Sequence, residues 1–229
     1  VNNLIIENSC ERGAGIALQT SSNISLNNNT IANNMGLGLW LTNGVEVDLL
    51  NCNIYGNSDN EIEFRDSDNP NNLSVSYSNI EDGQDSIITN NNGTVTWGSG
   101  NIDVDPMFVD TANGNYHLLA SSMLINAGHP DSTDSDGTRA DIGSHPYLNS
   151  YSGPTWYVNA TDGNNTTATG ASSSPFASIQ SAINFATTSG DSVTVAAGTY
   201  NEKLVVNERS IKIAGVSPHN TIINGNNNG

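Results

Sequence analysis

Positive charge is scarce in this chain of 229 residues, because only six are Lys or Arg against 23 Asp or Glu, which gives a formal net charge of −17. A surface of that sign without a basic patch excludes nucleic acids and anionic membranes as partners. Apolar runs are also short, and none approaches the roughly 18 residues of a membrane-spanning helix. The strong helix formers are scarce too, which excludes an all-α fold.

Cysteine is rare as well. Cys10 and Cys52 are too few for a disulfide scaffold, and no Cys/His spacing typical of a metal site occurs. The first residues lack the pattern of a signal peptide, which carries little weight because the repeat is already under way there. Asn, by contrast, is abundant at 37 residues. High Asn and Asp with little Lys favours an extracellular or cell-surface protein, bacterial or archaeal.

The most informative feature is a degenerate repeat of 18 to 26 residues. Segments of one row have apolar residues at their first and third positions, the alternation of a strand with one buried face. These segments begin at Leu4, Ile24, Val47, Leu73 and Val95. Two further rows accompany it, one through Ile31, Ile54 and Ile80, the other through residues 15–18, 37–41 and 62–64.

Two or three short strands in every repeat predict a coil whose turns stack on one another. Equivalent strands of such a coil form parallel sheets, about 4.8 Å apart. Asn and Gly crowd the intervals, as turns with a left-handed backbone require. Asn8, Asn28 and Asn51 share one register in this alignment and predict a ladder of stacked amides.

These coils resemble the right-handed parallel β-helix of the pectate-lyase-like superfamily. Gly100–Asp110 and Asp136–Gly143 are similar to the closing segment of many secreted β-helix proteins, and Ser174–Ile183 and Gly190–Glu202 resemble their opening segment. The resemblance implies an all-β fold of about seven coils with one short capping helix near 178–187. It divides the chain into central and C-terminal coils (1–105), a closing segment with a linker (106–153), and an opening segment with the first coils (154–229).

The order of these parts is unusual, because the closing segment precedes the opening one. Joining the C-terminus to the N-terminus keeps the repeat in phase: Ile211 and Ile213 then precede Leu4 and Ile6 by 22 residues. The chain is therefore one period of a tandem array, or a permuted fold. A permuted fold docks its last coil on its own first coil or on that of the next molecule, which generates a filament. Two unrelated half-domains are the plainer alternative. The expected assembly residues are Leu4, Ile6, Ile211, Ile213, Ile222 and Ile223.

Catalytic chemistry has weaker support. A lyase needs a basic residue beside acidic calcium ligands, and the coils hold only Arg12 and Arg65 as cations. A hydrolase needs converging carboxylates. A carboxylate patch could form from acids on two neighbouring sheets, although such alternation is also typical of a solvated strand face. Its members are Glu46, Asp48, Glu61, Glu63, Asp66 and Asp68.

A calcium loop is a second possibility for chemistry. Asp134 and Asp136 alternate before a glycine, and Asp141 could complete the oxygen ligands. The pattern is incomplete, because no glutamate follows at the spacing of a full loop. The simpler interpretation is an acidic loop with a salt bridge to Arg139. Calcium is thus the one cofactor that the sequence suggests.

Trp40 alternates out of phase with Leu37, Leu39 and Leu41, so it faces outward, either stacking on a sugar ring or packing under the closing segment. The leading hypothesis is a structural extracellular protein, a β-helical subunit of a head-to-tail filament or surface stalk that associates with itself. The alternatives are a carbohydrate-active β-helix protein, whether a polysaccharide-binding module, a lyase or a hydrolase, and a domain of a giant tandem-repeat adhesin.

Overall fold

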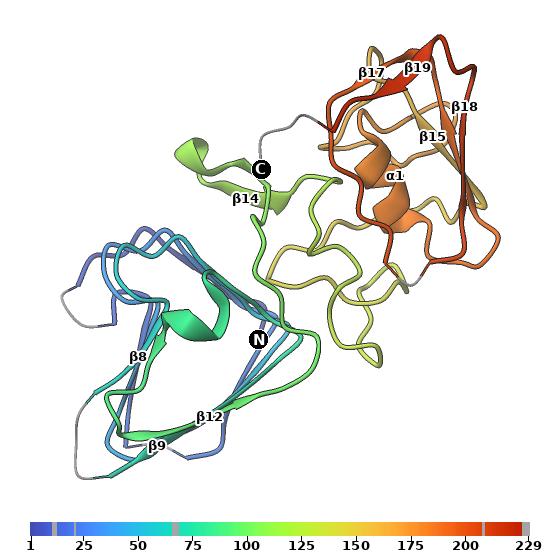
Figure 1. Cartoon of the computed structure of the whole chain (residues 1–229). Coiled ribbons are helices and arrows are strands. Elements are labelled where there is room, and N and C mark those ends of the chain that lie inside the picture. The colour runs from blue at the N-terminus through green and yellow to red at the C-terminus, as the bar shows by residue number, and fades with distance from the viewer. Residues whose placement is uncertain (11–12, 21, 66–68, 208, 226–229) are drawn as a thin grey trace. The chain divides into compact units, whose positions relative to one another are not determined.

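The computed structural model describes residues 1–10, 13–20, 22–65, 69–207 and 209–225. The chain forms two compact units (Figure 1). Unit 1 consists of Val1–Pro106 and Asn126–Pro146, and unit 2 of Met107–Ile125 and Tyr147–Gly229. The segment that resembles a closing segment is therefore shared between the two units.

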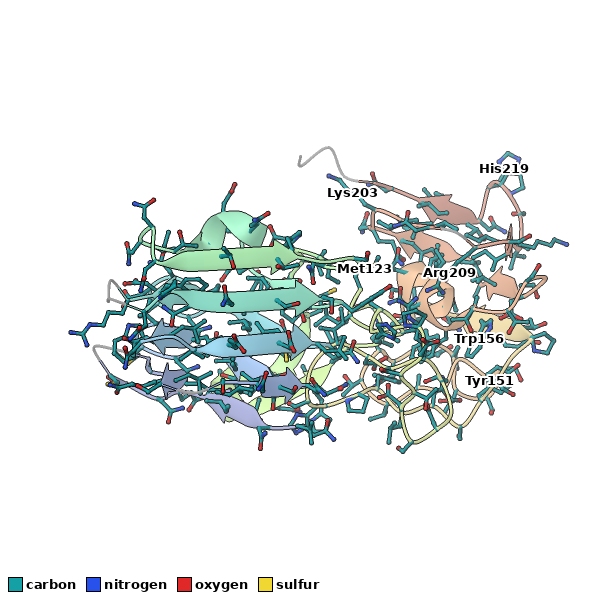
Figure 2. All side chains as sticks on the ribbon, turned by 90° about the horizontal axis from the view of Figure 1, so that it is seen from below. Met123, Tyr151, Trp156, Lys203, Arg209 and His219 are labelled. Atoms are coloured by element: carbon teal, nitrogen blue, oxygen red, sulfur yellow. The ribbon has the colours of Figure 1, made fainter. Side chains whose placement is uncertain are left out.

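Unit 1 is a stack of coils in which three parallel sheets form the sides of a triangle (Figure 1), and Figure 2 shows the stack from the side. Sheet 1 has the order β1-β4-β7-β10, sheet 2 the order β2-β5-β8-β11, and sheet 3 the order β3-β6-β9-β12. The strands of sheet 1 are β1 (Leu4–Ile6), β4 (Thr30–Ala32), β7 (Asn53–Tyr55) and β10 (Asn79–Ile80). Those of sheet 2 are β2 (Ile16–Gln19), β5 (Leu39–Thr42), β8 (Ile62–Phe64) and β11 (Ile87–Ile88). Those of sheet 3 are β3 (Ile24–Asn27), β6 (Glu46–Leu50), β9 (Asn71–Ser76) and β12 (Gly93–Trp97).

The core of unit 1 is a column of aliphatic side chains inside the triangle. Ile31 pairs with Ile54, and Ile54 with Ile80, and all three are fully buried. Inward residues of sheets 2 and 3 complete the same cluster. Each apolar layer thus packs on the layers above and below it. The alternation within a strand determines which residues face the core, and the offset between coils determines which of them pack on one another.

The turn between sheets 3 and 1 requires one residue with a left-handed backbone in each coil. Asn28, Asn51 and Tyr77 hold this position, with φ of 53°, 54° and 46°. Asn tolerates that conformation better than most residues, which explains its recurrence here. The Asn51 amide donates to the Asn28 side-chain oxygen at 3.5 Å, so these two amides do stack as expected.

The first strand is in a different row from the predicted one. Leu4 was aligned with Ile24, but β1 pairs with β4, so Leu4 lies beside Thr30 and Ile5 beside Ile31. The alignment was wrong because Leu4, Ile5 and Ile6 are all apolar and fit either phase. Ile5 is the residue that faces the core.

The segment 126–146 runs across the turns between sheets 3 and 1. The Gly143 N–H donates to the Asn51 carbonyl at 2.8 Å, and the His129 N–H donates to the Asn51 side-chain oxygen at 2.7 Å. The Ser144 N–H donates to the Thr30 hydroxyl at 3.0 Å. The segment therefore covers this corner of unit 1, and the predicted packing of Trp40 beneath it is not what these contacts show.

Unit 2 contains a second set of parallel strands and one short helix. One sheet has the order β15-β16-β18, another pairs β17 with β19, and an antiparallel pair joins β13 to β14. The strands of unit 2 are β13 (Phe108–Asp110), β14 (Asn115–Leu118), β15 (Thr155–Val158), β16 (Ser192–Val195), β17 (Gly198–Tyr200), β18 (Lys212–Gly215) and β19 (Thr221–Ile223). Its helices are α1 (Ile179–Phe185) and the 3-10 turn Thr111–Asn113, and a further 3-10 turn in unit 1 spans Gly83–Ser86.

Helix α1 confirms the predicted short helix near 178–187. Residues Ile179, Ala182 and Ile183 on its apolar face are buried, as the sequence pattern predicts. The partner of β16 differs, however, because Val193 pairs with Ile213 and not with Ile211. An even shift keeps the same alternation, so the sequence could not distinguish the two registers.

The described part of the chain contains about 9 turns, more than the seven that the sequence predicts. The difference arises because coils with few regular strands, such as the coil that starts with β15, leave little alternation to count. Among the described residues, no helix is long and apolar enough to cross a membrane.

Candidate functional site

Two neighbouring hollows open on the surface of unit 1, with volumes of about 660 Å³ and about 590 Å³. Both are lined by Asp59 and Asn60, so they adjoin each other, and we call the two hollows together the sheet 2 groove. The first hollow adds Leu37, Trp40, Glu63 and Arg65, and the second adds Glu61, Glu81, Asp82, Asp85 and Asp103.

Trp40 is the aromatic residue of this groove. It sits in β5 between the fully buried Leu39 and Leu41, so the alternation of the strand turns its indole to the outer face. Ala17 and Glu63 flank it in register on β2 and β8. A half-buried indole on a flat sheet surface presents a planar apolar face to a ligand.

Arg65 accompanies Trp40. The centre of its guanidinium group lies 5.9 Å from the centroid of the Trp40 ring, a cation–π distance. Its backbone N–H donates to the Leu41 carbonyl at 2.8 Å, which continues the pairing of β5 and β8 by one residue. The groove therefore combines an aromatic face, one guanidinium group and the carboxylate of Glu63 within one hollow.

The other hollow lies at the end of a row of hydrogen-bonded amides, in which Asn34 and Asn57 are buried and Asn8 is exposed. The Asn8 amide donates to the Asn34 side-chain oxygen at 3.0 Å, and the Asn34 amide donates to the Asn57 side-chain oxygen at 2.8 Å. The Asn57 amide in turn donates to the Glu61 carboxyl group at 2.5 Å. We call these four residues the amide ladder. Asn8 was expected beside Asn28, but the shift of the first coil places it beside Asn34.

Glu61 ends this ladder beside a second carboxyl group, that of Glu81. Burial raises the pKa of Glu61 to about 8, the hydrogen bonds from Asn57 oppose this rise, and the hydrogen-bonded Glu81 adds to it. Glu81 also accepts from the Gly56 N–H at 2.7 Å. At neutral pH Glu61 is therefore protonated, and its proton is shared with Glu81.

The surroundings of the pair are strongly negative. Burial raises the pKa of Tyr55, and Glu81, Asp105 and Asp103 add to the rise. No three His, Cys, Asp or Glu side chains among the described residues are grouped so that they could hold a metal ion. This hollow thus repels anions, and its carboxyl pair is stabilised by a shared proton.

Comparisons with known protein families agree with this architecture. A family model described as "Right handed beta helix region" matches residues 1–106, which hold the coils of unit 1. The chain is a right-handed parallel β-helix protein. A second model, described as "Protein of unknown function (DUF1565)", matches residues 161–226 of this β-helix protein. Searches of the curated proteins and of the solved structures found no match.

The predicted carboxylate patch is divided in the β-helix. Glu46 and Asp48 lie on the outer face of sheet 3, beside Asn72 and Ser74, in a separate hollow of about 210 Å³. Glu63 lies on the outer face of sheet 2, whereas Glu61 is buried just before β8. Asp66 and Asp68 lie outside the described residues. The four acids that the structure describes, Glu46, Asp48, Glu61 and Glu63, therefore do not form a single cluster.

The residues of the predicted calcium loop serve the local fold. Asp134 accepts from the Asp141 N–H at 2.8 Å, and Asp141 accepts from the Asn126 N–H at 2.7 Å. Asp136 accepts from the Thr138 N–H and hydroxyl at 3.0 Å and 2.7 Å. Arg139 donates to the Gly128 carbonyl at 2.6 Å. These carboxylates bind backbone and hydroxyl donors, and calcium there stays a prediction.

The expected assembly residues lie on outermost strands, apart from Ile211, which precedes β18. Leu4 and Ile6 belong to β1, Ile213 to β18, and Ile222 and Ile223 to β19. The sequence pattern did not reveal Asn57 and Glu81, which line the acidic half of the groove, or Asn34, which is hydrogen-bonded to Asn57. The recurrence of Asn8, Asn34 and Asn57 at intervals of 26 and 23 residues was a usable signal, but it was hidden among the many other asparagines.

Proposed function

We propose that this protein is an extracellular β-helix protein that binds a neutral or amino-substituted polysaccharide in the sheet 2 groove. The observation that carries the proposal is the outward Trp40, which lines a hollow of about 660 Å³ together with Arg65 and Glu63. Aromatic rings flanked by hydrogen-bonding side chains suit sugar rings, which have apolar faces and polar edges.

The charge of the groove supports one class of glycan over another. Asp59 and Glu63 line the hollow around Trp40, and five more carboxyl groups line the adjoining hollow. Repulsion between like charges disfavours a uronate polymer, the substrate class of the lyase interpretation. A neutral sugar or a cationic amino sugar meets no such penalty.

Binding fits this site better than cleavage does. Two catalytic carboxyl groups must reach opposite sides of a glycosidic bond. Glu61 is buried, and its oxygens accept from the Asn57 backbone and side chain. The raised pKa of Glu61 is accounted for by this burial and by Glu81, so it supplies no separate argument for a general acid.

Binding measurements test the proposal. Calorimetric titration with soluble neutral glucans, xylans and chitosan oligosaccharides should give saturable binding for at least one of them, and polygalacturonate should bind more weakly. Trp40→Ala should weaken that binding about tenfold, since stacking on an aromatic ring contributes about 1 kcal/mol or more. Tyr157→Ala is the matched control, because Tyr157 lies between two buried residues of β15 in unit 2.

The proposal fails if Trp40→Ala and Tyr157→Ala leave the affinity equally unchanged, or if the uronate polymer binds most tightly. The structural role predicted from the sequence, a filament subunit, a stalk or a domain of a tandem adhesin, is compatible with glycan binding. Its support comes from the continuity of the sequence repeat and not from the groove.

A further inference from the structure

Resting on the proposed function, we propose that the ligand of the sheet 2 groove is a chain of amino sugars that lies along the axis of the coils. One ring stacks on Trp40, and the ammonium groups of the following rings face the carboxyl groups of the adjoining hollow, which we call the acidic hollow. The glycan is therefore cationic, and it crosses the strands of sheet 2 instead of following one of them.

The groove follows the coil axis. Trp40 belongs to the coil of β5, Glu63 lies beside it in the coil of β8, and Asp85 belongs to the next coil, which continues into β11. Asp103 follows a residue that pairs with β10 from one coil further on. The strands of these coils lie one above another in Figure 2, so a ligand that reaches all four residues must cross them. Successive coils are about 4.8 Å apart, close to the length that one pyranose ring adds to an extended β-1,4 glycan.

The carboxyl groups of the acidic hollow are not neutralised by the protein. Seven carboxyl groups line the groove, and Arg65 is the one cation among the described residues that line it. Asp82, Asp85 and Asp103 are exposed, and within the described part of the chain their side chains form no ion pair and no hydrogen bond. Burial raises the pKa of Tyr55, and neighbouring carboxylates, Asp103 and Asp82 among them, raise it further. Uncompensated negative charge of this kind attracts a ligand with several positive charges.

The hollow around Trp40 favours a glycan over other cations. A pyranose ring with an amino substituent offers an apolar face to the indole and an ammonium group to Asp59 and Glu63, which line the same hollow. A basic peptide has no such ring and loses more conformational freedom when it is held in an extended form. The acids of the described residues do not group into a metal site either.

Arg65 gives the groove a direction. Its guanidinium centre lies 5.9 Å from the centroid of the Trp40 ring, so it repels an ammonium group at that end of the groove. The acidic hollow attracts one at the other end. Affinity should therefore depend on rings that extend beyond Trp40 into the acidic hollow, and not on the stacked ring alone.

Oligosaccharides of glucosamine and of N-acetylglucosamine test the charge and the direction, because both have the same backbone and only the first carries ammonium groups. Calorimetric titration at about pH 6 keeps the amino groups charged and the exposed carboxyl groups ionised. The glucosamine tetramer should bind about tenfold more tightly than the acetylated tetramer, and added salt should reduce this preference. Within the glucosamine series, affinity should rise from the dimer to the tetramer as each further ring reaches another coil.

A triple variant tests the carboxyl groups of the acidic hollow: Asp82→Asn, Asp85→Asn and Asp103→Asn. It should lose most of the preference for the glucosamine tetramer and keep the wild-type affinity for the acetylated one. The matched control removes the same charge from three exposed acids of unit 1 that do not line the groove, and it should keep the preference. Its changes are Glu46→Gln, Asp48→Asn and Asp131→Asn. Circular dichroism verifies that both variants keep their β structure.

The outcomes separate this inference from the proposed function. Equal affinity of the wild type for the two tetramers, or a preference that the triple variant retains, would overturn the inference. Glycan binding would still stand in that case if Trp40→Ala weakens the binding of both tetramers, and it would fall if Trp40→Ala changes neither. Equal affinity for the glucosamine dimer and tetramer would overturn the axial direction. Tetralysine that binds as tightly as the glucosamine tetramer would assign the acidic hollow to basic peptides and overturn the inference as well.

Discussion

Glu61 is a carboxyl group that the fold buries and keeps protonated. Its pKa is raised from 4.5 to about 8, chiefly by burial. The unfolded chain releases this proton near pH 4.5, and the folded chain holds it until about pH 8. The stabilisation from the folded state's extra proton is therefore fully present below pH 4.5 and is lost as the pH rises through about 8.

Glu61→Gln should remove this pH dependence, because an amide carries no charge at any pH. Its oxygen keeps one of the two hydrogen bonds from Asn57, and its NH2 group can donate to Glu81. We expect the variant to exceed the wild type in stability at alkaline pH, by an amount on the order of a few kcal/mol. Urea unfolding at a series of pH values measures the difference. Glu63→Gln, on the outer face of β8, is the control. Parallel pH profiles for Glu61→Gln and the wild type would contradict the shared proton.

The side chain of Asn34, in the amide ladder, accepts two hydrogen bonds and donates two, which is its full capacity. Its oxygen accepts from the Asn8 backbone and side chain, and its amide donates to the Ile5 carbonyl and to Asn57. Asn34→Ala leaves several of these groups unpaired in the interior, so we expect a loss of about 3 kcal/mol of unfolding free energy.

Asn72→Ala is the control for this prediction. Asn72 is exposed, and its oxygen accepts one hydrogen bond, from the Thr94 hydroxyl at 2.7 Å. Solvent can replace that bond, so we expect a change below about 1 kcal/mol. Denaturant unfolding of both variants compares the two positions. Equal losses would mean that stacked amides stabilise this protein no more in the core than on its surface.

Helix α1 is the element that depends most on its neighbours. Seven residues are too few for a stable helix in isolation. The Glu202 carboxylate accepts from the N–H groups of Ile179 and Gln180 at 2.8 Å and 2.9 Å, and Arg209 donates to the carbonyls of Ile183, Asn184 and Ala186. The next coil thus places a negative charge at the N-terminus of the helix and a positive charge at its C-terminus, as the helix dipole favours.

Glu202→Gln should weaken this arrangement. It removes the charge and one of two acceptor oxygens, so we expect a loss of about 1–2 kcal/mol and faster hydrogen exchange at the amides of Ile179 and Gln180. Lys203→Gln removes a neighbouring charge and should leave both amides protected. Exchange rates measured by NMR decide between them. Unchanged protection in Glu202→Gln would mean that apolar packing alone stabilises the helix.

The strands themselves show what a sequence can specify. Sheets 2 and 3 follow from the alternation, since Leu39 and Leu41 must share a face and Trp40 must take the other. The sequence alignment misplaced Ile5, because Leu4, Ile5 and Ile6 are all apolar and any of them can face the core. It misplaced Ile213, because a shift of the alignment by two residues keeps the same residues on the buried face of a strand. Glu81 was not found, because turns of variable length separate it from Glu61 in the sequence.

At the scale of the whole molecule, two compact units with separate cores imply two unfolding events. Ile54 is fully buried in the column of unit 1, and Ile183 is buried in helix α1 of unit 2. Each coil packs on its neighbours within one unit, so the loss of one buried side chain should lower the stability of that whole unit. Replacement of either isoleucine by alanine should cost about 2–4 kcal/mol.

Calorimetry should therefore resolve two transitions, with Ile54→Ala lowering the midpoint of one and Ile183→Ala lowering that of the other. The same two transitions distinguish two of the other variants. Asn34→Ala should lower the midpoint of the transition that Ile54→Ala lowers, and Glu202→Gln should lower the midpoint of the one that Ile183→Ala lowers. A single transition that both isoleucine variants shift equally would mean that the coils of the two units unfold as one cooperative stack. In that case Ile183→Ala would lower the stability of unit 1 as well.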